Sequence, residues 1–260
     1  MTFDATVAEP KRKARIYDPG VLVPLHELPD THQAIVYIRN RGFDPARLER
    51  LYGVAYCLDG KSFAGGVFNT SNTIAIPLYE DGRTVGWQCR LLYNPDSLTE
   101  DECAAFGFRK KENGRYLRPP KYFTSPGLQK STILFNQDWA RGSEVVVVTE
   151  GVFDALSVGL CGVATLGKQV SDEQVKKLSR WRLVVLLLDP DAASDQDRLA
   201  RRFPSDVLVV SVRLSGYKDA GECPRDELWR QIGESVDGNP YIRNAGLSLA
   251  SFKTLIDTKT

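Results

Sequence analysis

Three acidic side chains come directly after two strongly apolar runs of this sequence. Glu150 ends the run EVVVVTE (144–150), and Asp189 and Asp191 end the run RLVVLLLDPD (182–191). Apolar runs without polar alternation are typical of central strands that are covered on both faces. Because the carboxyl ends of parallel strands meet at one edge of a sheet, we expect these carboxylates to converge there.

A cluster of carboxylates repels itself, and a divalent cation relieves that repulsion. Mg²⁺ prefers hard carboxylate oxygens, so Mg²⁺ (or Mn²⁺) is the expected cofactor. Glu150, Asp189 and Asp191 are therefore the candidate catalytic and metal-binding residues of a site for metal-assisted phosphoryl transfer. Two plainer interpretations stay open: Glu150 could be a solvated residue of an ordinary turn, and the two aspartates could cap the following helix.

Strand-like and helix-like patterns alternate around these acids. The strand-like runs are EVVVVTE, GVATLG, RLVVLLLDPD and DVLVVSV, and the helix-like stretches between them are 152–160, 171–180 and 192–202. Gly151 lets the backbone turn sharply after Glu150. This alternation predicts an α/β fold with a mainly parallel sheet over residues 144–215.

Two helices are expected in the first half of the chain. One covers residues 31–42 with Thr31 as its cap, and the other covers 44–53 with Asp44 as its cap and Pro45 at its first position. A hairpin over 73–92 should turn at Asp81-Gly82, a loop should occupy 94–120, and a short strand should lie within 121–127.

The segment RKKENGRYLRPPK (109–121) holds six basic residues against one acid. Its cations are interleaved with Tyr116 and followed by Tyr122 and Phe123, an arrangement that favours contact with phosphates and bases of a nucleic-acid single strand. A solvated loop whose aromatic side chains pack inward is the alternative.

Composition narrows the class of protein. The formal net charge is +1, so any basic surface must be local. The five cysteines are scattered and never form a C-x-x-C pair, which predicts reduced thiols in a cytoplasmic protein and no zinc. No run reaches the roughly 18 apolar residues of a membrane helix, so no membrane is expected among the partners.

Four regions are expected. Residues 1–30 would form an extended arm, 31–143 a basic mixed α/β subdomain, 144–215 the parallel-sheet domain, and 216–260 a short helical segment.

The ordered set of a strand ending in E-G, a strand-turn GVATLG (162–167) and a strand ending in D-x-D resembles a TOPRIM domain. That fold is shared by bacterial-type primases, type IA and type II topoisomerases and some nucleases. The flanking segments NTIAIPLYEDGRTVGWQCRLL, PPKYFTSP, ILFN and RLSGYKDAGE resemble motifs of primases. Over roughly residues 31–235 the chain thus resembles the catalytic core of bacterial-type (DnaG-like) DNA primases, and compact phage primases look most similar.

The resemblance implies a role for individual residues. Glu150 would be a metal ligand or general base, Asp189 and Asp191 the metal-binding pair, and Asp219 a further metal ligand. The supporting positions are Gly151, Asp154 and Gly167. The nucleotide- and template-binding residues are Asn72, Arg90, Arg115, Arg118, Lys121 and Lys218.

The sequence also departs from the family pattern. Thr73 stands where the family usually has Arg, Gly221 where it has a second acid, and Pro190 and Ser194 where it has glycines. No zinc-binding module and no helicase domain can be identified. The expected partners therefore include a replicative helicase and a separate zinc-binding primase factor.

The function that the resemblance implies is that of a DNA primase catalytic subunit. Such an enzyme synthesises short RNA primers from NTPs on a single-stranded DNA template, here in the expected setting of phage DNA replication. Two alternatives remain: a TOPRIM-type metal-dependent nuclease, and a non-catalytic single-strand-binding replication factor. A nuclease would not need the K-Y-x-x-S-P segment at 121–126.

Overall fold

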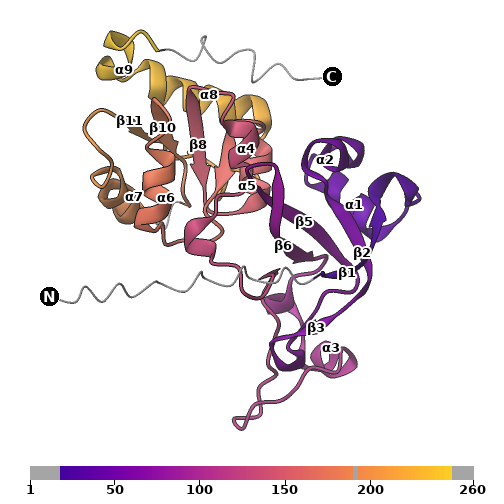
Figure 1. Ribbon diagram of the computed structural model, residues 1–260. Coiled ribbons are helices and arrows are strands. Elements are labelled where there is room, and N and C mark those ends of the chain that lie inside the picture. The colour runs from indigo at the N-terminus through magenta and orange to yellow at the C-terminus, as the bar shows by residue number, and fades with distance from the viewer. Residues whose placement is uncertain (1–17, 190–192, 248–260) are drawn as a thin grey trace, which may run out of the picture.

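The computed structural model describes residues 18–189 and 193–247, which form two main sheets with their helices and a small two-stranded ribbon (Figure 1). The first sheet has five antiparallel strands in the order β1-β2-β5-β6-β7. Its strands are β1 (Gly20–Pro24), β2 (Ala55–Gly60), β5 (Thr73–Glu80), β6 (Arg83–Leu91) and β7 (Tyr122–Thr124), and a separate small ribbon pairs β3 (Ser62–Phe63) with β4 (Phe68–Asn69).

The hairpin of β5 and β6 turns where the sequence predicts it. Asp81 has a φ of 52° and Gly82 a φ of 71°. Left-handed conformations at both central residues match the twist of antiparallel strands, and Asp-Gly adopts them at low cost. The hairpin prediction is confirmed.

Two helices, α1 (Gln33–Asn40) and α2 (Pro45–Tyr52), pack beside this sheet. The Asp44 side chain caps α2 by accepting a hydrogen bond from the Ala46 N–H, as predicted. The predicted cap of α1 is wrong, because the Nδ1 atom of His32, not Thr31, accepts the Ala34 N–H at 3.2 Å. A histidine acceptor substitutes for the usual hydroxyl.

Two segments are more ordered than their composition indicates. Residues 20–24, placed in an extended arm, form the edge strand β1 paired with β2. The predicted loop 94–120 contains the helix α3 (Glu100–Ala105), which begins at a capping box of Thr99 and Glu102. The short helical turns of the fold are η1 (Leu25–Glu27), η2 (Ala64–Gly66), η3 (Pro95–Ser97) and η4 (Lys130–Thr132).

The second sheet has four parallel strands in the order β11-β10-β8-β9, which confirms the predicted α/β architecture. Its strands are β8 (Val145–Thr149), β9 (Gly162–Ala164), β10 (Leu183–Leu186) and β11 (Leu208–Ser211). The helices of this half are α4 (Gln137–Ala140), α5 (Val152–Val158), α6 (Asp172–Leu178), α7 (Ala193–Ala200), α8 (Arg225–Asp237) and α9 (Pro240–Asn244).

The side chains of successive valines of β8 lie on opposite faces of this sheet. Val145 and Val147 pack in one apolar cluster with Trp229 of α8, whereas Val146 and Val148 pack in another with residues of α6 and α7. Coverage on both faces explains why the strand has no polar alternation.

A third apolar cluster joins the two sheets. Val152, Phe153 and Leu156 of α5 pack with Ile76 and Leu78 of β5 in one buried cluster. The helix that follows Glu150 is therefore held by both halves of the molecule.

All five cysteines are free thiols, as predicted, and the structure shows that all five are buried. Burial raises the pKa of Cys89 and of Cys161 to about 12. Within residues 18–189 and 193–247, no helix is long and apolar enough to cross a membrane.

Candidate active site

Glu150 and Asp189 lie next to each other at the carboxyl edge of the parallel sheet. Strands β8 and β10 are hydrogen-bonded neighbours, with Val148 opposite Leu186. The backbone N–H of Asp189 donates to Oε1 of Glu150 at 3.4 Å, and Glu150 is only 8% exposed. The structure thus brings these two acids together as the strand pattern predicts. Asp191 lies outside the described residues.

Two further acids are close to this edge, one on α5 and one on the loop after β11. The Gly221 N–H donates to Oδ1 of Asp154 at 3.0 Å. A Cβ atom on Gly221 would lie 3.0 Å from Asp154 Oδ1 and 3.3 Å from Asp219 Oδ1. Burial, together with the negative charges of Asp219 and Asp189, raises the pKa of Asp154 to about 7. Acids from three elements therefore interact electrostatically.

Hydroxyl groups fix the turn that carries Glu150 and the neighbouring turn after β9. The Thr149 hydroxyl donates to the Gly151 carbonyl at 3.1 Å, and the Thr165 hydroxyl donates to the Gly167 carbonyl at 2.8 Å. A Cβ atom on Gly151 would lie 2.6 Å from Oδ2 of Asp154. Glycine at 151 therefore leaves room for the Asp154 carboxylate, which gives this predicted supporting residue a physical reason.

Arg41, to which the sequence assigned no role in the site, is a cation close to these acids. It ends α1, and its guanidinium carbon lies 4.9 Å from the centre of the Phe153 ring. Its positive charge acts to lower the pKa of Asp154, against the effect of burial. Arg41 and Gly221 both line a cavity of about 510 Å³. The packing of α1 against α5 places Arg41 here, and no local motif indicates it.

Arg90, expected to bind nucleotide or template, is almost fully buried. It is 7% exposed, its Nε donates to the Tyr37 hydroxyl at 2.8 Å, and its guanidinium carbon lies 4.6 Å from the centre of the Tyr122 ring. Tyr37 also accepts a hydrogen bond from Arg41 Nε at 2.9 Å. Arg90 is thus joined through one tyrosine to the cation beside the acids. Direct contact with template stays a prediction.

The other predicted binding residues are spread over the first subdomain and the loop after β11. Arg118 donates to the carbonyls of Asp96 and Leu98 at 2.9 and 2.7 Å, and Lys121 pairs with the Asp96 carboxylate at 3.2 Å. Arg115 and Lys218 are exposed. These bonds give Arg118 and Lys121 structural partners, and their contacts with template remain predictions.

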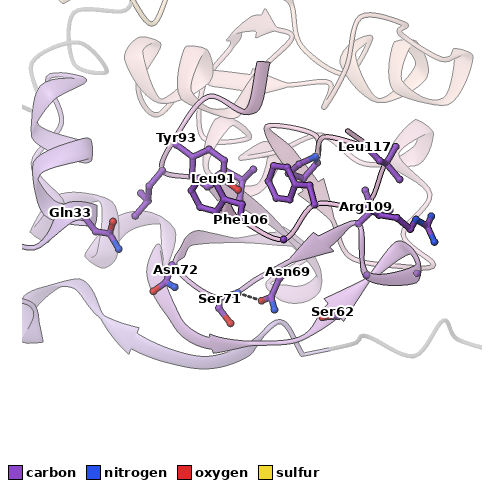
Figure 2. Close-up of a pocket in the computed structure, with 17 residues that line it drawn as sticks. Gln33, Ser62, Asn69, Ser71, Asn72, Leu91, Tyr93, Phe106, Arg109 and Leu117 are labelled. Carbon is purple, nitrogen blue, oxygen red and sulfur yellow. Dashed lines mark hydrogen bonds between the residues drawn. The ribbon is translucent and has the colours of Figure 1, made fainter. Parts of the chain in front are cut away.

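Asn72 has a left-handed conformation, with a φ of 57°, between β4 and β5. Its side-chain oxygen accepts a hydrogen bond from the Tyr56 hydroxyl. Asn72 also lines a cavity of about 620 Å³ in the first subdomain (Figure 2). The structure therefore places this predicted binding residue in the wall of a cavity, in addition to its role in the turn between β4 and β5.

Two of the aromatic side chains expected to meet bases pack inward instead. The Phe123 ring stacks on Phe68, with centroids 4.8 Å apart and planes at 17°. Burial raises the pKa of Tyr122, which lies under Arg90. The alternative interpretation from the sequence, inward packing, holds for these two side chains.

The acids at this edge of the sheet are the available donors for a metal ion. Glu150, Asp154, Asp189 and Asp219 supply carboxylate oxygens, the ligands that Mg²⁺ and Mn²⁺ prefer. Burial raises the pKa of Asp154, and the negative charges of Asp219 and Asp189 raise it further. Within the described residues, no three His, Cys, Asp or Glu side chains are grouped so that they could hold an ion. The chemistry of the donors fits such a metal, and Asp191 is the predicted ligand outside that set.

The parallel sheet carries acids at its carboxyl edge and shares one apolar core with the antiparallel sheet. This arrangement is that of a TOPRIM-type domain joined to a primase-like subdomain. The RNA polymerase domain of Mycobacterium tuberculosis primase DnaG superposes with a TM-score of 0.56 over 90% of this chain and 89% of that chain, at 15% identity. The Aquifex aeolicus primase gives a TM-score of 0.57 over 79% of this chain and 56% of that chain, at 21% identity. At such identities the likeness concerns the fold.

Sequence comparison relates the chain to DNA primases. The DNA primase of Thermotoga maritima is 30% identical over 245 residues, which cover 85% of this chain and 41% of that protein. The DNA primase of Chlamydia pneumoniae is 26% identical over 205 residues, 67% of this chain and 32% of that protein. No family model matches. The chain is a homologue of bacterial-type DNA primases with the fold of their catalytic core, and it spans less than half the length of these two relatives.

Proposed function

We propose that this chain is the catalytic core of a DNA primase, which joins NTPs into short RNA primers on a single-stranded DNA template. The observation that carries the proposal is the meeting of Glu150 and Asp189 across β8 and β10, with Asp154 and Asp219 beside them. This cluster occurs in a fold shared with primase catalytic domains, one of them solved bound to single-stranded DNA at a TM-score of 0.55.

Glu150 and Asp189 are the described residues that would hold Mg²⁺ or Mn²⁺, and the ion would need Asp191 beside them, because the described residues contain no group of three such side chains. Asp219 remains a predicted further ligand. Bound there, the ion supplies positive charge against the phosphates of an incoming nucleotide. Glu150 also fixes the chain after β10, because its carboxylate accepts the Asp189 N–H. This hydrogen bond holds the Glu150 carboxylate and the Asp189 backbone in place before substrate arrives, which is the preorganisation that electrostatic catalysis requires.

Arg41 supplies a fixed cation near Asp154. Its guanidinium is held by the Tyr37 hydroxyl and by the Phe153 ring, so it loses little conformational freedom when an anion approaches. The adjoining cavity of about 510 Å³, which Arg41 and Arg225 line, is large enough for a nucleotide. We place the triphosphate of an incoming NTP in this cavity, against Arg41 and beside Gly221, whose N–H donates to Asp154.

Partners and setting are part of the same proposal. A replicative helicase and a separate zinc-binding factor would raise the local concentration of template, and phage DNA replication remains the proposed setting. Added helicase should increase primer yield, and synthesis should still require the same acidic residues.

The test is incubation of the purified chain with end-labelled single-stranded DNA, NTPs and Mg²⁺ or Mn²⁺. Short RNA products that vanish when the metal is chelated support primer synthesis. Shortening of the labelled template without RNA product would instead identify a nuclease. Binding without either product would identify a non-catalytic single-strand-binding factor.

A further inference from the structure

Three aromatic rings stack on one another at the end of the first subdomain. The rings of Tyr93 and Phe106 have centroids 5.0 Å apart and planes at 21°, and those of Phe106 and Phe108 have centroids 5.5 Å apart and planes at 18°. Phe106 is 52% exposed. Large aromatic side chains are normally covered. The central ring of this stack is open to solvent, so the stack offers an exposed aromatic surface to which a ligand could bind.

The helix α3 holds this stack in place. Cys103 of α3 is fully buried, and its carbonyl accepts the Phe108 N–H at 3.0 Å. Gly107, with a φ of 71°, supplies the left-handed residue that this type of helix end requires. Phe106 and Phe108 thus flank one fixed turn. The backbone hydrogen bonds of this turn therefore fix the position of the exposed Phe106 ring.

The stack forms one wall of the cavity of about 620 Å³ shown in Figure 2, where Tyr93 and Phe106 lie above Asn72, Ser71 and Asn69. Asparagine amides carry both donors and acceptors. A flat apolar wall facing a row of amides and hydroxyls matches the chemistry of a nucleobase, which has two apolar faces and a polar edge.

A basic hairpin adjoins the same cavity. Residues 109–117 fold back on themselves, since Leu117 N–H donates to the Arg109 carbonyl and Lys111 N–H to the Arg115 carbonyl, each at 2.8 Å. The hairpin carries the cations Arg109, Lys110, Lys111 and Arg115 against the single acid Glu112. In the described part of the chain, no carboxylate lies within ion-pair distance of these four cations. Their charge favours an anionic partner such as a phosphate backbone.

We propose that Tyr93, Phe106 and Phe108 form a stacking platform for a base of single-stranded DNA, whose neighbouring phosphates meet the hairpin 109–117. The inference rests on the proposed function, because the ligand is the template strand of the proposed reaction. It assigns base stacking to residues 93–108, whereas Phe123 is committed to the interior.

The test measures fluorescence anisotropy of labelled oligothymidine with the full chain and with Phe106→Ala. Phe106 is the central ring of the stack, so its removal should abolish the platform and weaken binding about tenfold, the effect of one lost stacked base. Phe106→Tyr keeps a flat ring and should bind like the wild type. Tyr241→Ala is the matched control, because Tyr241 is 76% exposed on α9 at the opposite end of the molecule (Figure 1). It should leave binding unchanged. Thermal melts show whether each variant is folded.

A second set of binding measurements uses oligonucleotides in which a single abasic nucleotide is placed at successive positions of the strand. Wild type should lose about tenfold in affinity at one position, and Phe106→Ala should lose nothing further at that position. If wild type binds DNA and Phe106→Ala binds equally well, or if no abasic position matters, the platform is refuted and the primase proposal stands. If wild type binds no single-stranded DNA at any salt concentration, both proposals fail.

Discussion

Substitution of Arg90 by Met separates a structural role of this arginine from a template-binding role. Methionine keeps most of the apolar stem but removes the hydrogen bond to Tyr37 and the cation above the Tyr122 ring. A charged hydrogen bond contributes about 1.5–3 kcal/mol and a partly desolvated cation–π contact about 0.5–2 kcal/mol. Removing a buried charge also relieves its desolvation cost. We therefore expect the free energy of unfolding to fall by about 2 kcal/mol.

The assay is urea unfolding followed by tryptophan fluorescence, with Lys121→Met as the matched control. Lys121 is exposed and pairs with Asp96 at 3.2 Å. An exposed ion pair of this kind contributes about 0–1 kcal/mol. The Arg90 variant should therefore unfold at clearly lower urea than the Lys121 variant. If Arg90→Met leaves the unfolding free energy unchanged but weakens single-strand binding tenfold or more, Arg90 is a template contact and the structural reasoning fails.

Three further predictions follow from other parts of the structure. Gly162→Ala should lower the unfolding free energy by about 3 kcal/mol, because the new methyl would lie 2.3 Å from the Ala155 carbonyl oxygen; an unchanged thermal midpoint would contradict this. At pH 8 the Cys89 and Cys161 thiols should stay protonated, since burial raises the pKa of each to about 12, so a thiol reagent should modify them only after unfolding; fast modification of the native chain would refute it. Asp189→Asn should shift the Mg²⁺ optimum of primer synthesis upward, and an identical metal titration would exclude Asp189 as a ligand.

Local signals predicted the elements that carry the acids. The valine run of β8 and the leucine run of β10 are covered on both faces, and only a parallel pair brings both carboxyl ends to one edge. Asp44 as a cap and Asp81-Gly82 as a turn are equally local, because a few adjacent atoms decide the conformation. Local sequence patterns were therefore enough to predict that Glu150 and Asp189 lie next to each other.

The remaining features depend on contacts between distant segments. Arg41 reaches the acids only because α1 packs against α5, and Arg90 is buried only because Tyr37 and Tyr122 close over it. α3 is different, since the Thr99-x-x-Glu102 capping box was a readable signal within a segment that otherwise looks like a loop. Single-sequence patterns cannot show which basic residues become interior.

Primer synthesis by Glu150→Gln, compared with Glu144→Gln, tests the central claim most directly. Glutamine keeps the shape of Glu150 but removes the charge that would hold a metal ion. Glu144 begins the same segment but is exposed, with its carboxylate 3.7 Å from Arg182. The account predicts that Glu150→Gln folds, binds single-stranded DNA like the wild type and makes no primer, while Glu144→Gln makes primer at the wild-type level. Primer yield from Glu150→Gln near that of the wild type would contradict the assignment of this sheet edge as the active site.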